Sequence, residues 1–247
     1  MSVPPEKISA VVLAGGFGTR IKHLLGDLPK PMASVAGKPF IEWVVRYLAM
    51  QKIQNVIMST GYLAETVEKH FHSQPVKNIR ATCVPETKPL GTAGGFLNAI
   101  RGAKENPQAW LILNGDSLVT APLENFFQSL DDDKTEGAIL GVRAPDASRF
   151  GTISQNERGE LAGFNEKKPG AGIINAGVYL FRASAIEIFP EKIPLSFETD
   201  VFPSLSASGV RLKVCVTDAP FLDIGTPESL PLAENFIRKN AGCFQKE

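Results

Sequence analysis

Residues 8–20 read ISAVVLAGGFGTR, an apolar run that leads directly into a glycine-rich loop. The apolar run at 8–14 predicts a strand buried on both faces, as the strands of a parallel sheet are. Glycines let the backbone approach a ligand closely, and successive N–H groups can then surround phosphate oxygens. Because ligands of open α/β sheets bind beyond the carboxyl ends of the strands, the loop lies where such a site is expected.

Two common nucleotide-binding motifs fit this loop poorly. A Walker loop of the form G-x-x-x-x-G-K-[ST] is absent. A dinucleotide fingerprint needs a third small residue where Ile21 stands and a helix that begins at once, whereas Pro29 and Pro31 interrupt the chain here. Taken alone, the glycines are also compatible with a tight structural turn, since glycine loops are weak motifs.

Strand-like and helix-like segments alternate over the first two-thirds of the chain. Further strand-like runs cover 55–60, 80–84 and 110–113, and helix-like runs cover 39–51, 63–72 and 92–103. Such alternation implies right-handed crossover connections and a mostly parallel sheet.

The last third of the chain has a different character. Strand-like runs cover 137–142, 151–154, 161–164, 172–181 and 212–216, and helix-like runs cover 198–206 and 227–239. This pattern predicts a small antiparallel lobe laid beside the parallel sheet. We therefore expect an α/β fold with a mostly parallel mixed sheet flanked by helices, in a single domain over residues 1–247.

The composition limits the kinds of partner. Of the 247 residues 43% are hydrophobic, which favours a folded domain with a large core over a disordered chain. Lys plus Arg and Asp plus Glu number 26 each, so no charge excess points to nucleic acid or to a membrane surface. The first apolar run is too short for a secretion signal or a membrane span, and we expect a cytoplasmic protein.

Two cations follow the glycine loop. Arg20 ends it, and a guanidinium there can bind a phosphate through two hydrogen bonds. Lys30 stands between Pro29 and Pro31 on a stiff, extended segment, which preorganises its ammonium group. Taken alone, a lysine between prolines is equally compatible with a solvated side chain.

These motifs resemble the signature of the sugar-1-phosphate nucleotidyltransferases. Further matching segments follow in order: PLGTAGG at 89–95, NGD at 114–116, FNEK at 164–167, NAG at 175–177 and DIGTP at 223–227. The resemblance covers almost the whole chain. It implies a Rossmann-like fold in which residues 8–135 bind the nucleotide and residues 136–247 bind the sugar phosphate, and we expect no C-terminal β-helix of the kind found in longer members.

The resemblance implies transfer of a nucleoside monophosphate. A phosphate oxygen of the sugar 1-phosphate attacks the α-phosphorus of the NTP, and pyrophosphate leaves. Because the nucleophile is already ionised, the protein has to align anions and neutralise charge rather than remove a proton. In the family pattern Arg20, Lys30 and Asp116 are catalytic, and the histidines are expected on the surface or in loops.

The resemblance also assigns residues to the nucleotide, namely Leu13, Ala14, Gly15, Gly16, Gly18, Thr19, Arg20, Glu86, Pro89, Gly91, Thr92, Asn114 and Asp116. Glu86 precedes the segment that meets the base, and a carboxylate can accept hydrogen bonds from both N1–H and N2–H₂ of guanine. Adenine presents an acceptor at N1 and uracil offers a single such donor, so this residue favours GTP over UTP, dTTP and CTP. Taken alone, Glu86 is also compatible with an exposed loop position.

Two carboxylates are placed by the family pattern as ligands of Mg²⁺. Asp116 follows the strand-like run at 110–113, and Asp223 follows an apolar pair at 221–222. Carboxylates at the ends of separate strands can converge on one hard cation, which keeps water and substrate phosphates in its shell. Each aspartate by itself could instead cap a turn or a helix.

For the sugar phosphate the resemblance implies Gly151, Glu166, Lys167, Asn175, Gly177 and Glu198. The frequent family form has a proline directly after the lysine, which Lys167 lacks, so Lys168 is an alternative. Asn175 lies in an apolar run, where an amide is costly to bury without a partner, and a sugar hydroxyl would be a suitable one. Glu198 is also compatible with a helix-terminal charge, and Gly151 with a turn.

Within the family, the likeness is greatest to short guanylyltransferases that act on D-glycero-α-D-manno-heptose 1-phosphate, with mannose-1-phosphate guanylyltransferases close behind. Uridylyl-, thymidylyl- and cytidylyltransferases of other sugars are further alternatives. A non-catalytic subunit that binds nucleotide sugars would be expected to lack Lys30, Asp116 or Asp223, which are all present. A glycosyltransferase would be expected to carry a D-x-D-like motif, which NGD at 114–116 is not. The oligomeric state is left open.

Overall fold

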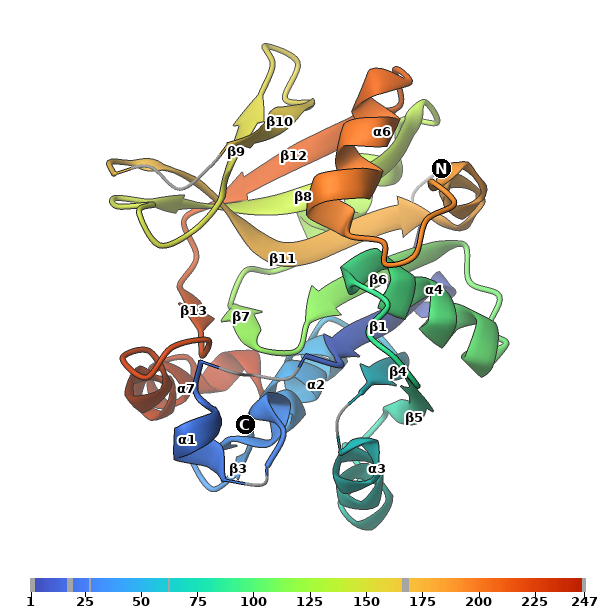
Figure 1. The fold of residues 1–247 in the computed structure, drawn as a ribbon. Coiled ribbons are helices and arrows are strands. Elements are labelled where there is room, and N and C mark those ends of the chain that lie inside the picture. Colours follow the sequence, from blue (N-terminus) through green and yellow to red (C-terminus); the bar gives the residue numbers. More distant parts are fainter. Residues whose placement is uncertain (1–2, 17–19, 27, 62, 166–168, 246–247) are drawn as a thin grey trace.

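The computed structural model describes residues 3–16, 20–26, 28–61, 63–165 and 169–245. A nine-stranded mixed sheet crosses the whole molecule, with helices packed on both of its faces (Figure 1). The architecture agrees with the α/β class predicted from the alternation of apolar runs.

Four strands form the parallel half of the sheet. In the order β6-β1-β4-β5 they cover Ala109–Asn114, Ile8–Ala14, Asn55–Thr60 and Arg80–Pro85. The helices that cross between them are α2 (Phe40–Met50), α3 (Ala64–Ser73) and α4 (Thr92–Ala103). The predicted strand–helix alternation is therefore confirmed from β1 to β6.

The antiparallel strands continue the same sheet. They are β8 (Thr135–Ala144), β9 (Thr152–Gln155), β10 (Leu161–Asn165) and β11 (Gly172–Arg182), and β12 (Arg211–Thr217) runs parallel to β8. β11 is antiparallel to β6 over its second half and pairs with β8 along most of its length. The expected antiparallel lobe beside the parallel sheet is confirmed, and the two parts are continuous because β11 pairs with both β6 and β8.

Two pairs of short strands were not predicted from the sequence. Ser34–Val35 (β2) pairs with Lys38–Pro39 (β3), and Ser117–Val119 (β7) pairs with Phe221–Asp223 (β13). Runs of two or three residues are too short to display a strand period. The second pair is important for the site, because it joins the segment after β6 to the segment after β12.

The remaining helical segments are short. α1 covers Lys22–Leu25, α5 Glu124–Phe127, α6 Phe202–Ala207 and α7 Ala233–Lys239. Tight 3₁₀ turns cover Pro5–Lys7, Lys30–Met32, Gln128–Leu130, Ala183–Ile188, Leu230–Leu232 and Ala241–Cys243, and a π turn covers Phe197–Val201. Within the described ranges, none of the helices combines the length and the apolar character needed to cross a bilayer.

The structure corrects two predicted helices of the last third. The helix expected at 198–206 is a π turn, Phe197–Val201, that continues into α6. The helix expected at 227–239 becomes α-helical only at Ala233, because the hydroxyls of Thr226 and Ser229 bond each other's backbone N–H groups in the turn before it. Such side-chain bonds to the backbone compete with helix formation.

The helices divide between the two faces of the sheet. One apolar cluster joins α2, α3 and α7 to alternate strand residues such as Val12 and Leu111, and a second joins α4 and α6 to Val11 and Ile112. Neighbouring strand residues go to opposite faces because a strand is pleated. The parallel strands are thus held from both sides, which fixes the carboxyl edge where ligands are expected.

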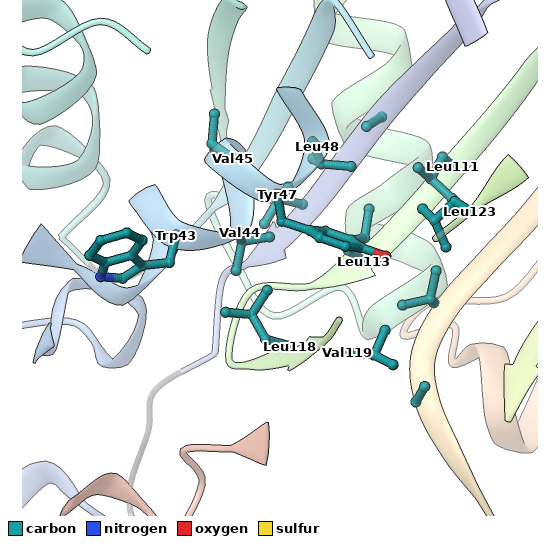
Figure 2. Close-up of a cluster of buried hydrophobic side chains, with 14 of the residues drawn as sticks. Trp43, Val44, Val45, Tyr47, Leu48, Leu111, Leu113, Leu118, Val119 and Leu123 are labelled. Atoms are coloured by element: carbon teal, nitrogen blue, oxygen red, sulfur yellow. The ribbon is translucent and has the colours of Figure 1, made fainter. Parts of the chain in front are cut away.

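Figure 2 shows the first of these faces, where α2 directs Val44 and Tyr47 toward Leu113 of β6 and Leu118 of β7. All four side chains are buried. The hydroxyl of Tyr47 donates a hydrogen bond to the carbonyl of Ala121 at 2.7 Å, so its one polar group is satisfied.

A buried carboxylate links α2 to α3. The side chain of Glu42 is 2% exposed, and it accepts hydrogen bonds from Arg46 at 2.8 Å and pairs with Lys38 at 3.0 Å and with His70 of α3 at 2.8 Å. His70 is therefore not the surface or loop residue expected from sequence. Burial raises the pKa of Glu42, but the bonds from Arg46, Lys38 and His70 outweigh it, so the pKa lies below its ordinary value.

Replacing Glu42→Gln should lower the free energy of unfolding by about 1.5–3 kcal/mol at neutral pH, because the surrounding cations lose their charged hydrogen-bond partner. A carboxyl with a lowered folded-state pKa contributes stability above its unfolded pKa and loses it as the pH falls through the folded value. Urea unfolding should therefore show that the difference in the free energy of unfolding between wild type and Glu42→Gln is greatest at neutral pH and decreases below about pH 4. Glu65→Gln, whose side chain is 86% exposed, is the control. A difference in the free energy of unfolding between wild type and Glu42→Gln that did not change with pH would contradict this explanation.

Candidate active site

A pocket of about 330 Å³ lies beyond the carboxyl ends of β1 and β6. Leu13 of β1 pairs with Asn114 of β6, and the N–H of Gly115 donates to the Leu13 carbonyl at 2.8 Å, so the two strand ends stay in register. The pocket is lined by Leu13, Gly15, Gly16, Glu86, Pro89, Leu90, Gly91, Thr92, Asn114 and Asp116. Its position is the one at which open α/β sheets bind ligands.

The lining corresponds closely to the residues assigned to the nucleotide from sequence. Every lining residue except Leu90 belongs to that set. Of the remaining members, Ala14 is buried, whereas Arg20 is exposed and does not line the pocket. Gly18 and Thr19 lie outside the described residues. The structure thus brings the strand ends and the segment at 86–92 together around one cavity.

The carboxylate of Glu86 turns toward the glycine loop. Its Oε1 accepts a hydrogen bond from Ser59 Oγ at 3.0 Å, and its Oε2 accepts one from the N–H of Leu90 at 3.3 Å. A Cβ on Gly15 would lie 2.7 Å from Oε1, and one on Gly95 would lie 2.5 Å from it. Glycine at these two positions therefore leaves the space that the carboxylate occupies, and Glu86 is half-buried rather than a freely exposed loop residue.

Lys30 and Asp116 form a charged pair at the pocket. The 3₁₀ turn Lys30–Met32 starts directly after Pro29, and the Lys30 side chain is 12% exposed. Its Nζ donates a hydrogen bond to Oδ2 of Asp116 at 2.6 Å. The segment is therefore a turn at Lys30 rather than the extended stretch expected from the flanking prolines, and the charge-assisted bond is what holds the ammonium group in one place.

The short β7–β13 pair brings Asp223 to the same place. Asp223 pairs with Ser117, and the N–H of Ile224 donates to the carbonyl of Asp116 at 2.9 Å. Two aspartates that are more than a hundred positions apart in sequence are therefore fixed beside each other by backbone hydrogen bonds. This is the convergence expected from their positions after separate apolar runs.

The charges of this cluster influence one another. Burial raises the pKa of Asp223 above its ordinary value, and the charge of Asp116 raises it further, whereas Lys30 lowers it. The N–H of Gly225 donates to Asp223 Oδ1 at 2.8 Å, and a Cβ on Gly225 would lie 2.6 Å from that oxygen and 3.0 Å from Lys30 Nζ. Asp116, Asp223 and Lys30 together carry one excess negative charge.

The donor set is suited to a hard divalent cation that completes its shell with water and phosphate oxygens. Asp116 and Asp223 offer carboxylate oxygens, and neither is fully buried. Within the described ranges no group of three or more His, Cys, Asp or Glu side chains could hold a metal ion by itself. Any cation bound here would therefore depend on ligands from a substrate or from water.

A second and larger pocket, of about 870 Å³, lies over the antiparallel strands. It is lined by Phe150, Gly151, Leu161, Ala162, Gly163, Phe164, Asn175, Glu198, Thr199, Phe202, Pro203 and Ser206. Three of the residues assigned to the sugar phosphate, Gly151, Asn175 and Glu198, are therefore brought together. Gly177 is buried, does not line the pocket and donates its N–H to Asn175 Oδ1 at 2.9 Å. Glu166, Lys167 and the alternative Lys168 lie outside the described residues.

A chain of side-chain hydrogen bonds connects the two pockets. Glu198 Oε2 accepts hydrogen bonds from Thr92 Oγ1 at 3.1 Å and from Ser196 Oγ at 2.8 Å, and its Oε1 accepts one from the Tyr179 hydroxyl at 2.9 Å. Asn175 Nδ2 donates to the same hydroxyl at 2.8 Å. Thr92 lines the smaller pocket, whereas Glu198 and Asn175 line the larger one.

Several of these residues were missed by sequence reasoning. Tyr179 lies in an apolar run and reads as core, and Ser196 belongs to no motif. The aromatic wall of the larger pocket, in which Phe164 stacks on Phe202 with ring centroids 5.3 Å apart, gives no local signal either. The only usable hint is the NAG motif at 175–177, which ends two residues before Tyr179.

Comparison with known protein families agrees with this architecture. The family described as nucleotidyl transferase matches residues 9–240. The chain therefore belongs to the nucleotidyl transferase family.

Individual relatives are similar over most of the chain. D-glycero-α-D-manno-heptose 1-phosphate guanylyltransferase of Campylobacter jejuni is 32% identical over 222 residues, which cover 90% of this chain and 96% of the relative. Mannose-1-phosphate guanylyltransferase of Mycobacterium tuberculosis is 34% identical over 239 residues, which cover 96% of this chain but 64% of that relative. The crystal structure of HddC from Yersinia pseudotuberculosis complexed with GMP-PN matches with a TM-score of 0.82 at 33% identity, over 93% of this chain and 99% of that one. The predicted nucleotidyltransferase fold is confirmed.

Proposed function

We propose that this protein transfers GMP from GTP to a sugar 1-phosphate, D-glycero-α-D-manno-heptose 1-phosphate, and releases pyrophosphate. The observation that carries the proposal is the contact between the pockets, where Thr92 of the smaller one donates at 3.1 Å to Glu198 of the larger one. A nucleotide in the first and a sugar phosphate in the second would be neighbours, as the two substrates of a nucleotidyl transfer must be. The names of the Campylobacter and Yersinia relatives support this choice of substrates.

In this proposal the site works by neutralising charge. Both reactants are phosphate anions, and Lys30, held at 2.6 Å from Asp116, supplies a fixed positive charge at the pocket. Preorganised charges of this kind stabilise a transition state without reorganising during the reaction. A phosphate nucleophile is already ionised, so no general base is required. Arg20 is exposed and adjoins the loop, from which a guanidinium would reach the phosphates of a bound nucleotide.

The cation in this proposal is Mg²⁺, held by Asp116 and Asp223. Enzymes of this family generally use a divalent metal, and two carboxylates that leave room for water and phosphate fit Mg²⁺ well. When bound, the ion would add positive charge at the reacting phosphates. The proposal also assigns residues 8–135 to the nucleotide and 136–247 to the sugar phosphate within a single domain, with Asp223 reaching back to the first part, and it places the protein in the cytoplasm.

A mannose 1-phosphate is the second candidate for the acceptor. The Mycobacterium relative with that name is 34% identical, slightly more than the Campylobacter relative, but the chain spans 64% of its length. Both acceptors share the manno configuration around the ring, so the larger pocket could bind either ring through the same groups. The length covered favours the heptose phosphate, because the chain spans 96% of the Campylobacter relative.

The direct test is pyrophosphate release in the presence of Mg²⁺, measured for GTP, ATP, UTP, dTTP and CTP against the 1-phosphates of heptose, mannose and glucose. We expect the highest kcat/KM with GTP and the heptose phosphate. The highest value with mannose 1-phosphate would select the second candidate. No turnover of any pair by folded protein would overturn the proposal and favour a subunit that binds nucleotide sugars without catalysis.

Replacing Glu86→Gln should weaken the preference for GTP over the other nucleotides by about tenfold or more, because a carboxylate that accepts from both guanine donors is worth about 1–3 kcal/mol. The measurement is kcat/KM for each NTP at a fixed concentration of the sugar phosphate. Glu65→Gln on α3 is the control, since its side chain is 86% exposed. An unaltered nucleotide profile in Glu86→Gln would place the base elsewhere.

A further inference from the structure

One fully buried hydroxyl group, that of Tyr179, lies behind the lining of the larger pocket. Tyr179 of β11 is 0% exposed and does not line the pocket itself. Its hydroxyl lies 2.9 Å from Glu198 Oε1 and 2.8 Å from Asn175 Nδ2. Both neighbours do line the pocket, so one buried group contacts two of the polar side chains that a ligand would meet.

The direction of these hydrogen bonds is determined by their surroundings. Asn175 Oδ1 accepts from the N–H of Gly177 at 2.9 Å, so its Nδ2 must face Tyr179 and donate. The hydroxyl then has its one proton left for the carboxylate of Glu198. Burial, together with the charge of Glu198, raises the pKa of Tyr179 well above its ordinary value, so this proton is retained.

The position of the hydroxyl is fixed by packing. The ring of Tyr179 lies with its centroid 5.1 Å from Phe197 and 5.0 Å from Phe202, and all three side chains are buried. A close-packed core permits little movement of a side chain of this size. The other oxygen of Glu198 is held by Ser196 and Thr92, so the whole carboxylate is fixed.

We propose that Tyr179 is a positioning residue that holds Glu198 and Asn175 in the arrangement required to bind the hydroxyl groups of the sugar phosphate. This inference rests on the proposed function, in which these two residues contact the sugar. A carboxylate that accepts and an amide group that is held in one orientation, at a fixed separation, select a particular arrangement of sugar hydroxyls. Tyr179 acts through them without touching the substrate.

The test is Tyr179→Phe, which removes the hydroxyl and keeps the ring. Using the sugar 1-phosphate with the highest kcat/KM, we expect its KM to rise about tenfold, as for the loss of one hydrogen bond to a charged group. The KM for GTP should change less than about twofold, because the nucleotide pocket keeps its lining. A similar rise in both KM values would indicate general loosening of the protein and would overturn the positioning role.

Tyr47→Phe provides a matched control. Tyr47 is also 0% exposed, and its hydroxyl makes one buried hydrogen bond, to the carbonyl of Ala121 on the other face of the sheet. The Tyr47→Phe variant should lose as much stability as Tyr179→Phe does, while its KM values for GTP and for the sugar phosphate stay unchanged. Urea unfolding of both variants sets a temperature at which each is folded, so that the kinetic comparison reports on the site.

A second pair of variants separates this inference from the proposed function. In a background that carries both Glu198→Gln and Asn175→Ala, Tyr179→Phe should add less than about twofold to the KM, because both residues through which it acts have already been changed. A further tenfold rise in the KM of that combined variant would overturn the inference. The inference would also be overturned if Glu198→Gln raised the KM for the sugar phosphate and Tyr179→Phe did not. An unchanged KM in both Glu198→Gln and Asn175→Ala would instead reject the proposed sugar pocket.

Discussion

Lys30→Met should lower kcat by a factor of about 10²–10³, by analogy with the loss of a donor that acts chiefly in the transition state. Lys30 is the cation that the structure holds at 2.6 Å from Asp116, with only 12% of its side chain exposed. Methionine keeps much of the apolar stem and removes the charge. The KM for GTP should change much less than kcat, because the glycine loop and the segment at 86–92 still line the nucleotide pocket.

The same substitution should leave the protein folded. The loss of one hydrogen bond to a charged group costs about 1.5–3 kcal/mol, which urea unfolding can measure. Lys69→Met on α3, where the side chain is 80% exposed, is the control and should leave both quantities unchanged. Unchanged turnover in Lys30→Met would remove this lysine from the reacting phosphates and leave its bond to Asp116 as a structural one.

Much of the smaller pocket could be predicted because its signals are local. The run at 8–14 is followed by glycines at the carboxyl end of a strand, and Lys30 stands between prolines. Short stretches of sequence therefore indicate both where the site lies and which charged group it contains. The same holds for Glu86, which lines the smaller pocket and stands just before the motif at 89–95. The sequence could not show that its carboxylate would occupy the space left by Gly15 and Gly95, because those contacts join three separate segments.

The joining of distant segments was harder to predict. Asp116 and Asp223 were expected to converge, but the three-residue strands that bring them together, β7 and β13, have no period to detect. The antiparallel lobe lies beside the parallel strands as expected, but the sequence did not show that β11 would join the two through hydrogen bonds to β6. Tyr179 lies in an apolar run, and its side chain is buried in the core. Its hydroxyl also has two polar partners, Glu198 and Asn175, which come within hydrogen-bonding distance only in the folded chain.

Asp223→Asn should abolish most of the activity and yet stabilise the protein in the absence of metal. If Asp223 binds Mg²⁺, its loss should lower kcat at least about 100-fold, since the charge of a bound metal is worth several kcal/mol to a transition state. The stability effect has the opposite sign. Asp223 is partly buried beside Asp116, and its pKa is raised in the folded state, so the ionised form opposes folding.

The pH dependence of this gain follows from the direction of the shift. The folded pKa lies above the unfolded value of about 3.9, so the cost of ionised Asp223 is complete above the folded pKa and disappears as the pH falls to the unfolded one. In a chelator, the unfolding midpoint of Asp223→Asn should therefore exceed that of the wild type at neutral pH and meet it in acid.

Added Mg²⁺ should reverse that order, because an ion that binds only the folded state stabilises it. It should raise the midpoint of the wild type and leave that of Asp223→Asn nearly unchanged, whether or not a sugar phosphate is present. Asp218→Asn, with a side chain 80% exposed, is the matched control and should behave as the wild type does. Equal stabilisation of wild type and Asp223→Asn by Mg²⁺ would show that the ion binds without this carboxylate, and the two-aspartate site would then have to be abandoned.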